Sequence, residues 1–168
     1  MNELNKYNLV RDQMRTGDLL QWRSNSLLGK LIRWKTGAKV NHSSLVIRMK
    51  EYEGLERRVF TTEALEHGII LNLLSKRLQD HAGSVWWYPL KVYMNEKRQS
   101  IGEEAFRYMG IGYDYLSLFK QIIGKVNVDA KKLFCSEYVY LCYGYIGKAP
   151  NPGEMMKLGI FEEPTQIC

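Results

Sequence analysis

The chain has 168 residues, of which 45% are hydrophobic and 25% charged. This composition excludes a disordered protein and predicts one folded domain over residues 1–168. Its formal net charge of +6 favours encounter with anionic partners, yet it holds no RNA-binding aromatic motif and no phosphate-binding loop, so specific nucleic-acid binding is not expected. No apolar run approaches the length of a membrane span and the first residues lack a signal-peptide core, so we expect a cytoplasmic location.

The cysteine pattern excludes two further classes of protein. Cys135, Cys142 and Cys168 are odd in number and lack the spacing of zinc ligands, so neither a disulfide framework nor a metal site is predicted. Free thiols suit a reducing compartment. The sequence points to no organic cofactor, and it leaves the oligomeric state open.

The first predicted elements are a strand and a basic helix. Residues 18–22 (DLLQW) follow a Thr-Gly turn and are typical of a short strand. Between Ser24 and Gly37 the large apolar residues fall near helical spacing, and Lys30, Arg33 and Lys35 stand at other positions. Such a helix either packs on the core with a solvated charged face or binds an anionic group or a membrane surface, and both interpretations stay open.

The middle of the chain predicts mostly strands, and the last third predicts helices. The predicted strands cover residues 43–49, 58–64, 68–71 and 84–90, and the first two form a hairpin. The predicted helices are a short one that carries Leu74 and Leu78, one over residues 96–109, one over residues 116–124 and one that begins at Ser136. These elements do not alternate in a βαβ rhythm, so we expect an α+β fold with a mainly antiparallel sheet.

Cys135 is the first candidate for chemistry. It precedes the helix predicted to begin at Ser136, where unpaired backbone N–H groups and the positive end of the helix dipole lower the pKa of a thiol. Lys131 and Lys132 act in the same direction. The alternative is that Cys135 is a small apolar residue that opens a buried helix, an interpretation that suits Cys142 better.

A cysteine nucleophile needs a general base, and the chain has three histidines. His42 stands at the start of the strand predicted at residues 43–49, where its ring can project from the sheet edge toward a helix terminus. His67 adjoins a glycine in a predicted turn and His81 lies at the end of a predicted helix, so both are expected to be solvated. His42 is therefore the predicted base.

The predicted hairpin brings a carboxylate to this histidine. If its connection is centred between Tyr52 and Glu53, His42 lies directly opposite Glu63, with both side chains on one face of the sheet. A carboxylate in that place orients the imidazole and stabilises its charged form. A register shift of one residue would put the two on opposite faces. The alternative for Glu63 is a solvated charge at a strand end.

In their order along the chain, these residues resemble a known family. The segments TGDLLQW, NHSSLVI, TTEALEHGI, GIGYDY and FCSEYV, spread from Thr16 to Val139, are similar to the permuted NlpC-type superfamily of papain-like proteins, in its YaeF/YiiX branch. In that branch the catalytic residues run in the order His, acidic residue, Cys. The resemblance implies a permuted papain-like fold with His42 as base, Glu63 as the residue that orients it and Cys135 as nucleophile.

The resemblance also implies roles for two further residues, Tyr113 and Ser136. It implies that Tyr113, from the GxxYD segment, lies near the substrate pocket, with a packing role as the alternative. Ser136, next to the nucleophile, is expected to contribute hydrogen bonding at the helix start and to lie beside the substrate.

The implied activity is that of a cysteine amidase or peptidase that forms a thioester acyl-enzyme with a small peptide, a cell-wall fragment or a lipid. Backbone N–H groups at the start of the Ser136 helix, with that of Cys135, are expected to hold the oxyanion. Two alternatives stay open: a lipid acyltransferase or thioesterase of the lecithin:retinol type, and a non-catalytic ligand-binding module. With no export signal expected, action on the cell wall would need release by other means.

Overall fold

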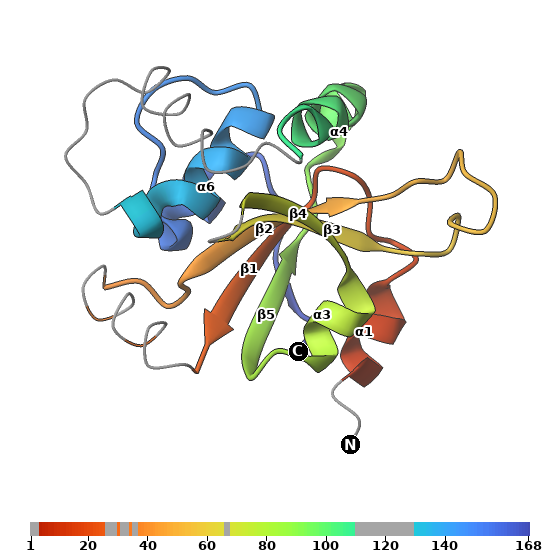
Figure 1. Cartoon of the computed structure of the whole chain (residues 1–168), viewed down its shortest axis with the longest axis horizontal. Coiled ribbons are helices and arrows are strands. Elements are labelled where there is room, and N and C mark those ends of the chain that lie inside the picture. Colours follow the sequence, from red (N-terminus) through yellow and green to blue (C-terminus); the bar gives the residue numbers. More distant parts are fainter. Residues whose placement is uncertain (1–3, 26–29, 31–33, 35–36, 66–67, 110–129) are drawn as a thin grey trace.

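The computed structural model describes residues 4–25, 30, 34, 37–65, 68–109 and 130–168, and Figure 1 shows their arrangement. The described strands form one six-stranded sheet in the order β4-β3-β2-β1-β5-β6, and all neighbours are antiparallel. The strands are β1 (Leu19–Ser24), β2 (His42–Ile47), β3 (Phe60–Leu65), β4 (Gly68–Leu73), β5 (Gly83–Tyr88) and β6 (Thr165–Gln166). The α-helices are α1 (Leu4–Val10), α3 (Leu74–Gln79), α4 (Arg98–Arg107) and α6 (Ala130–Cys142), and the 3-10 helices are η1 (Val92–Lys97) and η2 (Pro152–Leu158).

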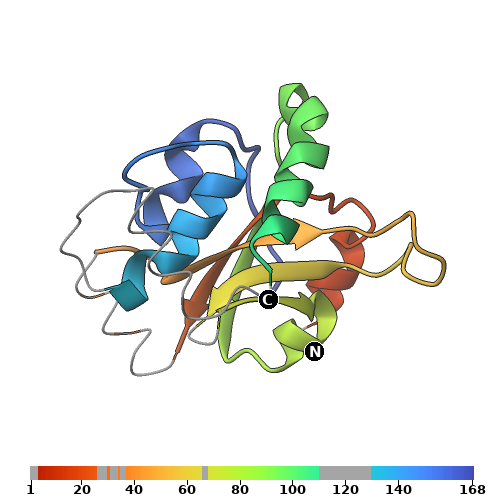
Figure 2. The same ribbon diagram turned by 45° about the horizontal axis from the view of Figure 1, so that its top comes forward.

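Helices cover both faces of the sheet. Figures 1 and 2 show α4 and α6 on one face and α1 and α3 on the other. Because successive side chains of a strand point to opposite faces, a strand contributes residues to the hydrophobic core on each side of the sheet. Leu45 and Ile47 of β2 join the core that includes residues of α6, whereas Val46 joins the core that includes Leu74 and Leu78 of α3. The predicted α+β class with a mainly antiparallel sheet is confirmed.

Most predicted elements are present with ends that differ by a few residues. The helix predicted at residues 96–109 is divided into η1 and α4, and the last helix begins earlier than predicted. Three described elements, α1, η2 and β6, have no counterpart among the sequence predictions. The helix predicted over residues 116–124 and most of the basic helix predicted between Ser24 and Gly37 lie outside the described residues. Of the helices that the structure describes, none has the length and apolar character needed to cross a bilayer.

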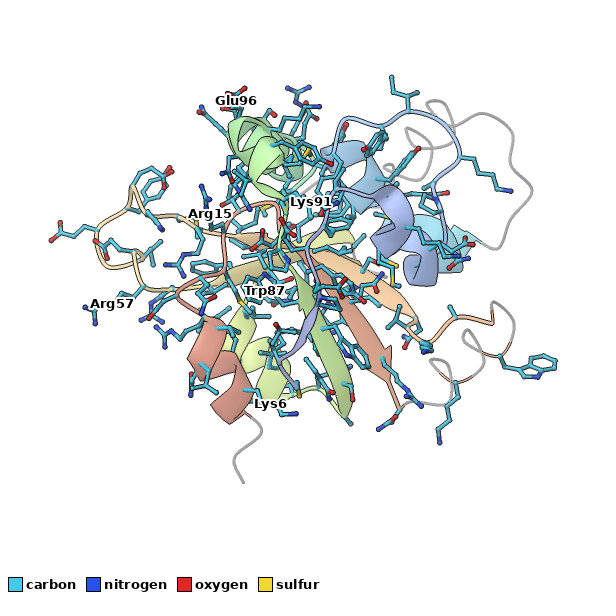
Figure 3. All side chains as sticks on the ribbon, turned by 180° about the vertical axis from the view of Figure 1, so that it is seen from behind. Lys6, Arg15, Arg57, Trp87, Lys91 and Glu96 are labelled. Carbon is cyan, nitrogen blue, oxygen red and sulfur yellow. The ribbon has the colours of Figure 1, made fainter. Side chains whose placement is uncertain are left out.

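A buried ion pair fixes the start of β1 relative to α4. Asp18 is only 1% exposed, and its Oδ1 accepts hydrogen bonds from Arg98 Nη1 at 2.7 Å and from the backbone N–H of Leu90 at 3.0 Å. Its Oδ2 accepts from Trp87 Nε1 and from the backbone N–H of Arg15, both at 2.9 Å. Figure 3 labels Arg15 and Trp87, which approach this position from the loop before β1 and from β5. One carboxylate thus ties four segments together.

Candidate active site

The register of β2 and β3 differs from the predicted one by two residues. Val46 pairs with Thr61, whereas the predicted hairpin put it opposite Val59. A shift of two residues leaves every side chain on its own face of the sheet. His42 and Glu63 therefore share the α3 face, as predicted, but they are not directly opposed, so the predicted direct pairing is wrong.

His42 and Glu63 nevertheless meet through their side chains. Nε2 of His42 lies 2.9 Å from Oε2 of Glu63, and the side chains are 14% and 0% exposed. This bond occupies one ring nitrogen, so the other is left for the sulfur of Cys135, with which the imidazole also forms a hydrogen bond. Carboxylate, imidazole and thiol are thus joined in series.

Cys135 reaches this site from α6, which packs over β2 and β3 (Figure 1). It is the sixth residue of that helix, so the predicted helix start at Ser136 is wrong. The backbone N–H groups of Ser43 and Ser136 donate to its sulfur. Ser43 is free to do so because N–H groups along an antiparallel strand alternate between its two neighbours, and the ladder with β3 begins only at Leu45.

The imidazole and the thiol shift each other's ionisation. Burial by itself would lower the pKa of His42, but the negative charge and hydrogen bonding of Cys135 and Glu63 outweigh it and raise the pKa to about 9. Burial would raise the pKa of the Cys135 thiol, but the charged imidazole and its hydrogen bond hold that pKa below its usual value. Both shifts therefore act toward a thiolate beside an imidazolium.

Glu63 is a fully buried carboxylate that accepts four hydrogen bonds. Besides His42, Asn72 Nδ2 donates to Oε1 at 3.0 Å, and Arg77 donates from Nε to Oε1 at 2.9 Å and from Nη2 to Oε2 at 3.3 Å. Burial would raise the pKa of Glu63, but the bonds from His42 and Arg77 lower it to about 2. The carboxylate of Glu63 therefore stays charged at any physiological pH.

Sequence reasoning missed both of these partners of Glu63. Asn72 interrupts the apolar run from Ile69 to Leu74, and this polar residue inside a strand was the one available signal. Arg77 carries no such signal, because it reaches Glu63 only once α3 has folded back beside β3 and β4. Its guanidinium also lies over the ring of Trp22, 4.8 Å from the centroid.

The other predicted residues have mixed outcomes. His81 was expected to be solvated, but it is 8% exposed and its ring packs edge-on against Trp22 with centroids 5.1 Å apart, so that expectation is wrong. Burial, with Arg77 nearby, lowers its pKa. Ser136 is buried beside Cys135, and its contact with substrate stays a prediction. Tyr113 and His67 lie outside the described residues.

Comparison with known proteins now identifies the family. Residues 13–166 match the family model described as permuted papain-like amidase enzyme, YaeF/YiiX, C92 family. The chain belongs to this family. The predicted resemblance and the permuted papain-like fold are confirmed, and a cysteine hydrolase of the amidase or peptidase kind is the general activity that the family supports. None of the curated proteins matches the chain.

A solved structure supports the same fold. The crystal structure of metalloprotein yiiX from Escherichia coli O157:H7 is 20% identical to this chain and superposes with a TM-score of 0.57. The match covers 78% of this chain and 65% of the yiiX chain, so the family member described here spans less than two thirds of that protein.

The description of yiiX as a metalloprotein raises the question of a metal site. In the part of this chain that the structure describes, no group of three or more His, Cys, Asp or Glu side chains could hold an ion. At the candidate active site, the guanidinium of Arg77 contacts both oxygens of Glu63 and would repel a metal cation there. These residues do not fit a metal, and no step below is routed through one.

Proposed function

We propose that this family member is a cysteine amidase or peptidase in which Cys135 is the nucleophile, His42 moves protons and Glu63 orients His42. The observation that carries this proposal is the series of hydrogen bonds that runs from a buried carboxylate through an imidazole to a thiol. The opposed pKa shifts of the thiol and the imidazole support it, because a lowered thiol pKa and a raised imidazole pKa both act toward a reactive thiolate.

The acylation step follows from this arrangement. The thiolate of Cys135 attacks a carbonyl carbon, and the electrons of the C=O double bond move to oxygen. When the tetrahedral intermediate collapses, the imidazolium of His42 gives its proton to the departing amine, and a thioester remains on the sulfur. Glu63 holds the ring in place and stabilises its positive charge before the proton leaves.

Deacylation uses the same groups in reverse. Neutral His42 takes a proton from a water molecule as that water attacks the thioester, and the sulfur leaves as a thiolate. If an alcohol or amine replaces water as acceptor, the reaction becomes acyl transfer, so hydrolysis and transfer share one site.

The substrate class is proposed from the family. Membership of an amidase family favours an amide of a small peptide or cell-wall fragment over a lipid ester. The predicted anionic or membrane contact of the basic segment between Ser24 and Gly37 stays a prediction, because only part of that segment is described. Cytoplasmic location also stays a prediction.

Trapping the acyl-enzyme tests the proposal directly. We would incubate the full chain with activated acyl esters and short peptide amides, quench in acid and measure the intact mass. The expected result is a covalent acyl adduct on the peptide that contains Cys135. Cys142→Ala, two helical turns further along α6, is the matched control and should keep the adduct. An adduct that persists in Cys135→Ala would refute the proposal.

A further inference from the structure

Two adjacent serines at the start of β2 differ in what their hydroxyls contact. Both are fully buried. Ser44 Oγ accepts hydrogen bonds from Trp22 Nε1 and Thr61 Oγ1, each at 2.8 Å. Ser43 Oγ has no hydrogen-bond partner in the described part of the chain. A buried hydroxyl without a partner costs desolvation free energy, so its presence calls for a physical reason.

Ser43 contacts the proposed nucleophile through its backbone. The backbone N–H of Ser43 donates to the sulfur of Cys135, and the hydroxyl belongs to the same residue. Strand alternation puts Ser43 with Leu45 and Ile47 on the α6 face, from which Cys135 approaches. Ser44 points to the opposite face.

The other hydrogen-bond donors described near the sulfur already donate to another acceptor. The backbone N–H groups of Ser43 and Ser136 already donate to the sulfur itself. Cys135 is the sixth residue of α6, beyond the four N–H groups that a helix leaves unpaired, so its own N–H is not placed as the predicted helix start required. Gln21 is paired with Ser43 across β1 and β2, but its side-chain amide donates to the carbonyl oxygen of Pro152. In the part of the chain that the structure describes, the hydroxyl of Ser43 has no such partner and can serve as the donor.

We propose that the Ser43 hydroxyl donates a hydrogen bond to the oxyanion that forms when Cys135 attacks a carbonyl. This inference rests on the proposed function and adds a residue that touches the reacting atoms. Before substrate arrives the hydroxyl has no partner among the described residues, and in the tetrahedral intermediate it gains a charged acceptor. A donor that is used only in the transition state accelerates the chemical step without tightening substrate binding.

Two reagents that modify the same sulfur can isolate this role. With 4-nitrophenyl acetate a C–S bond forms and the C=O electrons move to oxygen. Collapse restores C=O and breaks the bond between the acyl carbon and the 4-nitrophenoxy oxygen, which releases 4-nitrophenolate and leaves a thioester on the sulfur. With iodoacetamide the sulfur displaces iodide from a methylene carbon, and no oxyanion forms. The ratio of the two rate constants therefore reports oxyanion stabilisation and not thiolate content.

The experiment measures both rate constants at Cys135 in the full chain at pH 7. Ser43→Ala should slow acylation by about 10²-fold and change alkylation by less than about twofold. Ser44→Ala is the matched control, because it removes an equally buried hydroxyl from the neighbouring position, and it should leave the ratio unchanged. Ser43→Thr keeps a hydroxyl and should restore most of the acylation rate.

The outcomes separate this inference from the proposed function. An unchanged ratio in Ser43→Ala overturns the role of Ser43 and leaves the proposed function standing. A large loss of stability in Ser43→Ala under urea also overturns it, because the hydroxyl would then be structural. If neither reagent prefers Cys135 over Cys142 in the unaltered protein, the proposed function itself fails.

Discussion

Two buried carboxylates in this protein are each paired with an arginine, and they differ in their remaining partners. Asp18, paired with Arg98, accepts its other hydrogen bonds from an indole and from backbone N–H groups, none of which titrates. Glu63, paired with Arg77, accepts one of its bonds from His42, which in turn contacts Cys135.

The difference shows that burial of a carboxylate does not by itself mark a functional site. Both groups avoid the cost of an unpaired buried charge in the same way, through an arginine and several donors. Of the two, only Glu63 is hydrogen-bonded to a side chain that can gain and lose a proton, the imidazole of His42. We therefore expect changes at Asp18 to affect stability and changes at Glu63 to affect chemistry as well.

The largest expected effect is on catalysis in Glu63→Gln. An amide of the same shape cannot stabilise the imidazolium, so the rate of Cys135 acylation by 4-nitrophenyl acetate should fall by about 10²- to 10⁴-fold. Stopped-flow detection of 4-nitrophenolate measures this rate. An unchanged rate would remove Glu63 from the site and leave it comparable to Asp18.

Asp18→Asn should have the next largest effect, on stability alone. Removing this charge leaves Arg98 buried without its counter-ion, which should lower the free energy of unfolding by about 3–5 kcal/mol. Urea unfolding measures the loss. The acylation rate per folded molecule should stay the same, and a selective loss of rate would contradict the structural role given to Asp18.

The depressed pKa of Glu63 predicts a further effect at acid pH. Its pKa is about 2 in the folded protein against an ordinary 4.5, so the stability it contributes is fully present above pH 4.5 and is lost as the pH falls toward 2. The shift corresponds to about 3 kcal/mol. Urea unfolding across this range should show the unaltered protein and Glu63→Gln converging as pH falls, and parallel curves would contradict the assignment.

The smallest expected effect belongs to Cys142→Ala. This thiol is 2% exposed in the core and burial raises its pKa, so it differs chemically from Cys135 on the same helix. Its replacement should cost about 1 kcal/mol in the free energy of unfolding and leave the acylation rate unchanged. A loss of acylation would mean that the two thiols do not have separate roles.

How far the sequence predicts this structure depends on the range of the interactions involved. Strands such as β2 and β3 carry their signal locally, through β-branched residues that alternate between two faces. β6 pairs with β5 about 80 residues earlier in the chain, and nothing within Thr165–Gln166 indicates this. α6 begins at Ala130 and not at Ser136 as predicted, because the alanine and lysines at residues 130–132 favour a helix.

The sequence predicted which site residues share a face of the sheet, but it did not predict which side chains contact each other. The alternation of β2 and β3 put His42 and Glu63 on one side of the sheet under the predicted register and under the observed one. The exact register depends on the bend of the loop between the strands, which the sequence does not fix. Arg77 joins the site through the packing of α3, and Ser43 through its neighbour on α6, so both required the folded chain.

The most direct test of the central claim is the pH dependence of alkylation at Cys135, with Cys142 as internal reference. Iodoacetamide labelling, followed by peptide mass analysis, gives the rate at each sulfur from pH 4 to 10. The account predicts that Cys135 reacts rapidly well below its ordinary pKa of 9.0, and that His42→Ala removes this reactivity. If Cys135 instead follows the profile of an ordinary thiol in both proteins, the thiolate–imidazolium pair does not exist and the account is wrong.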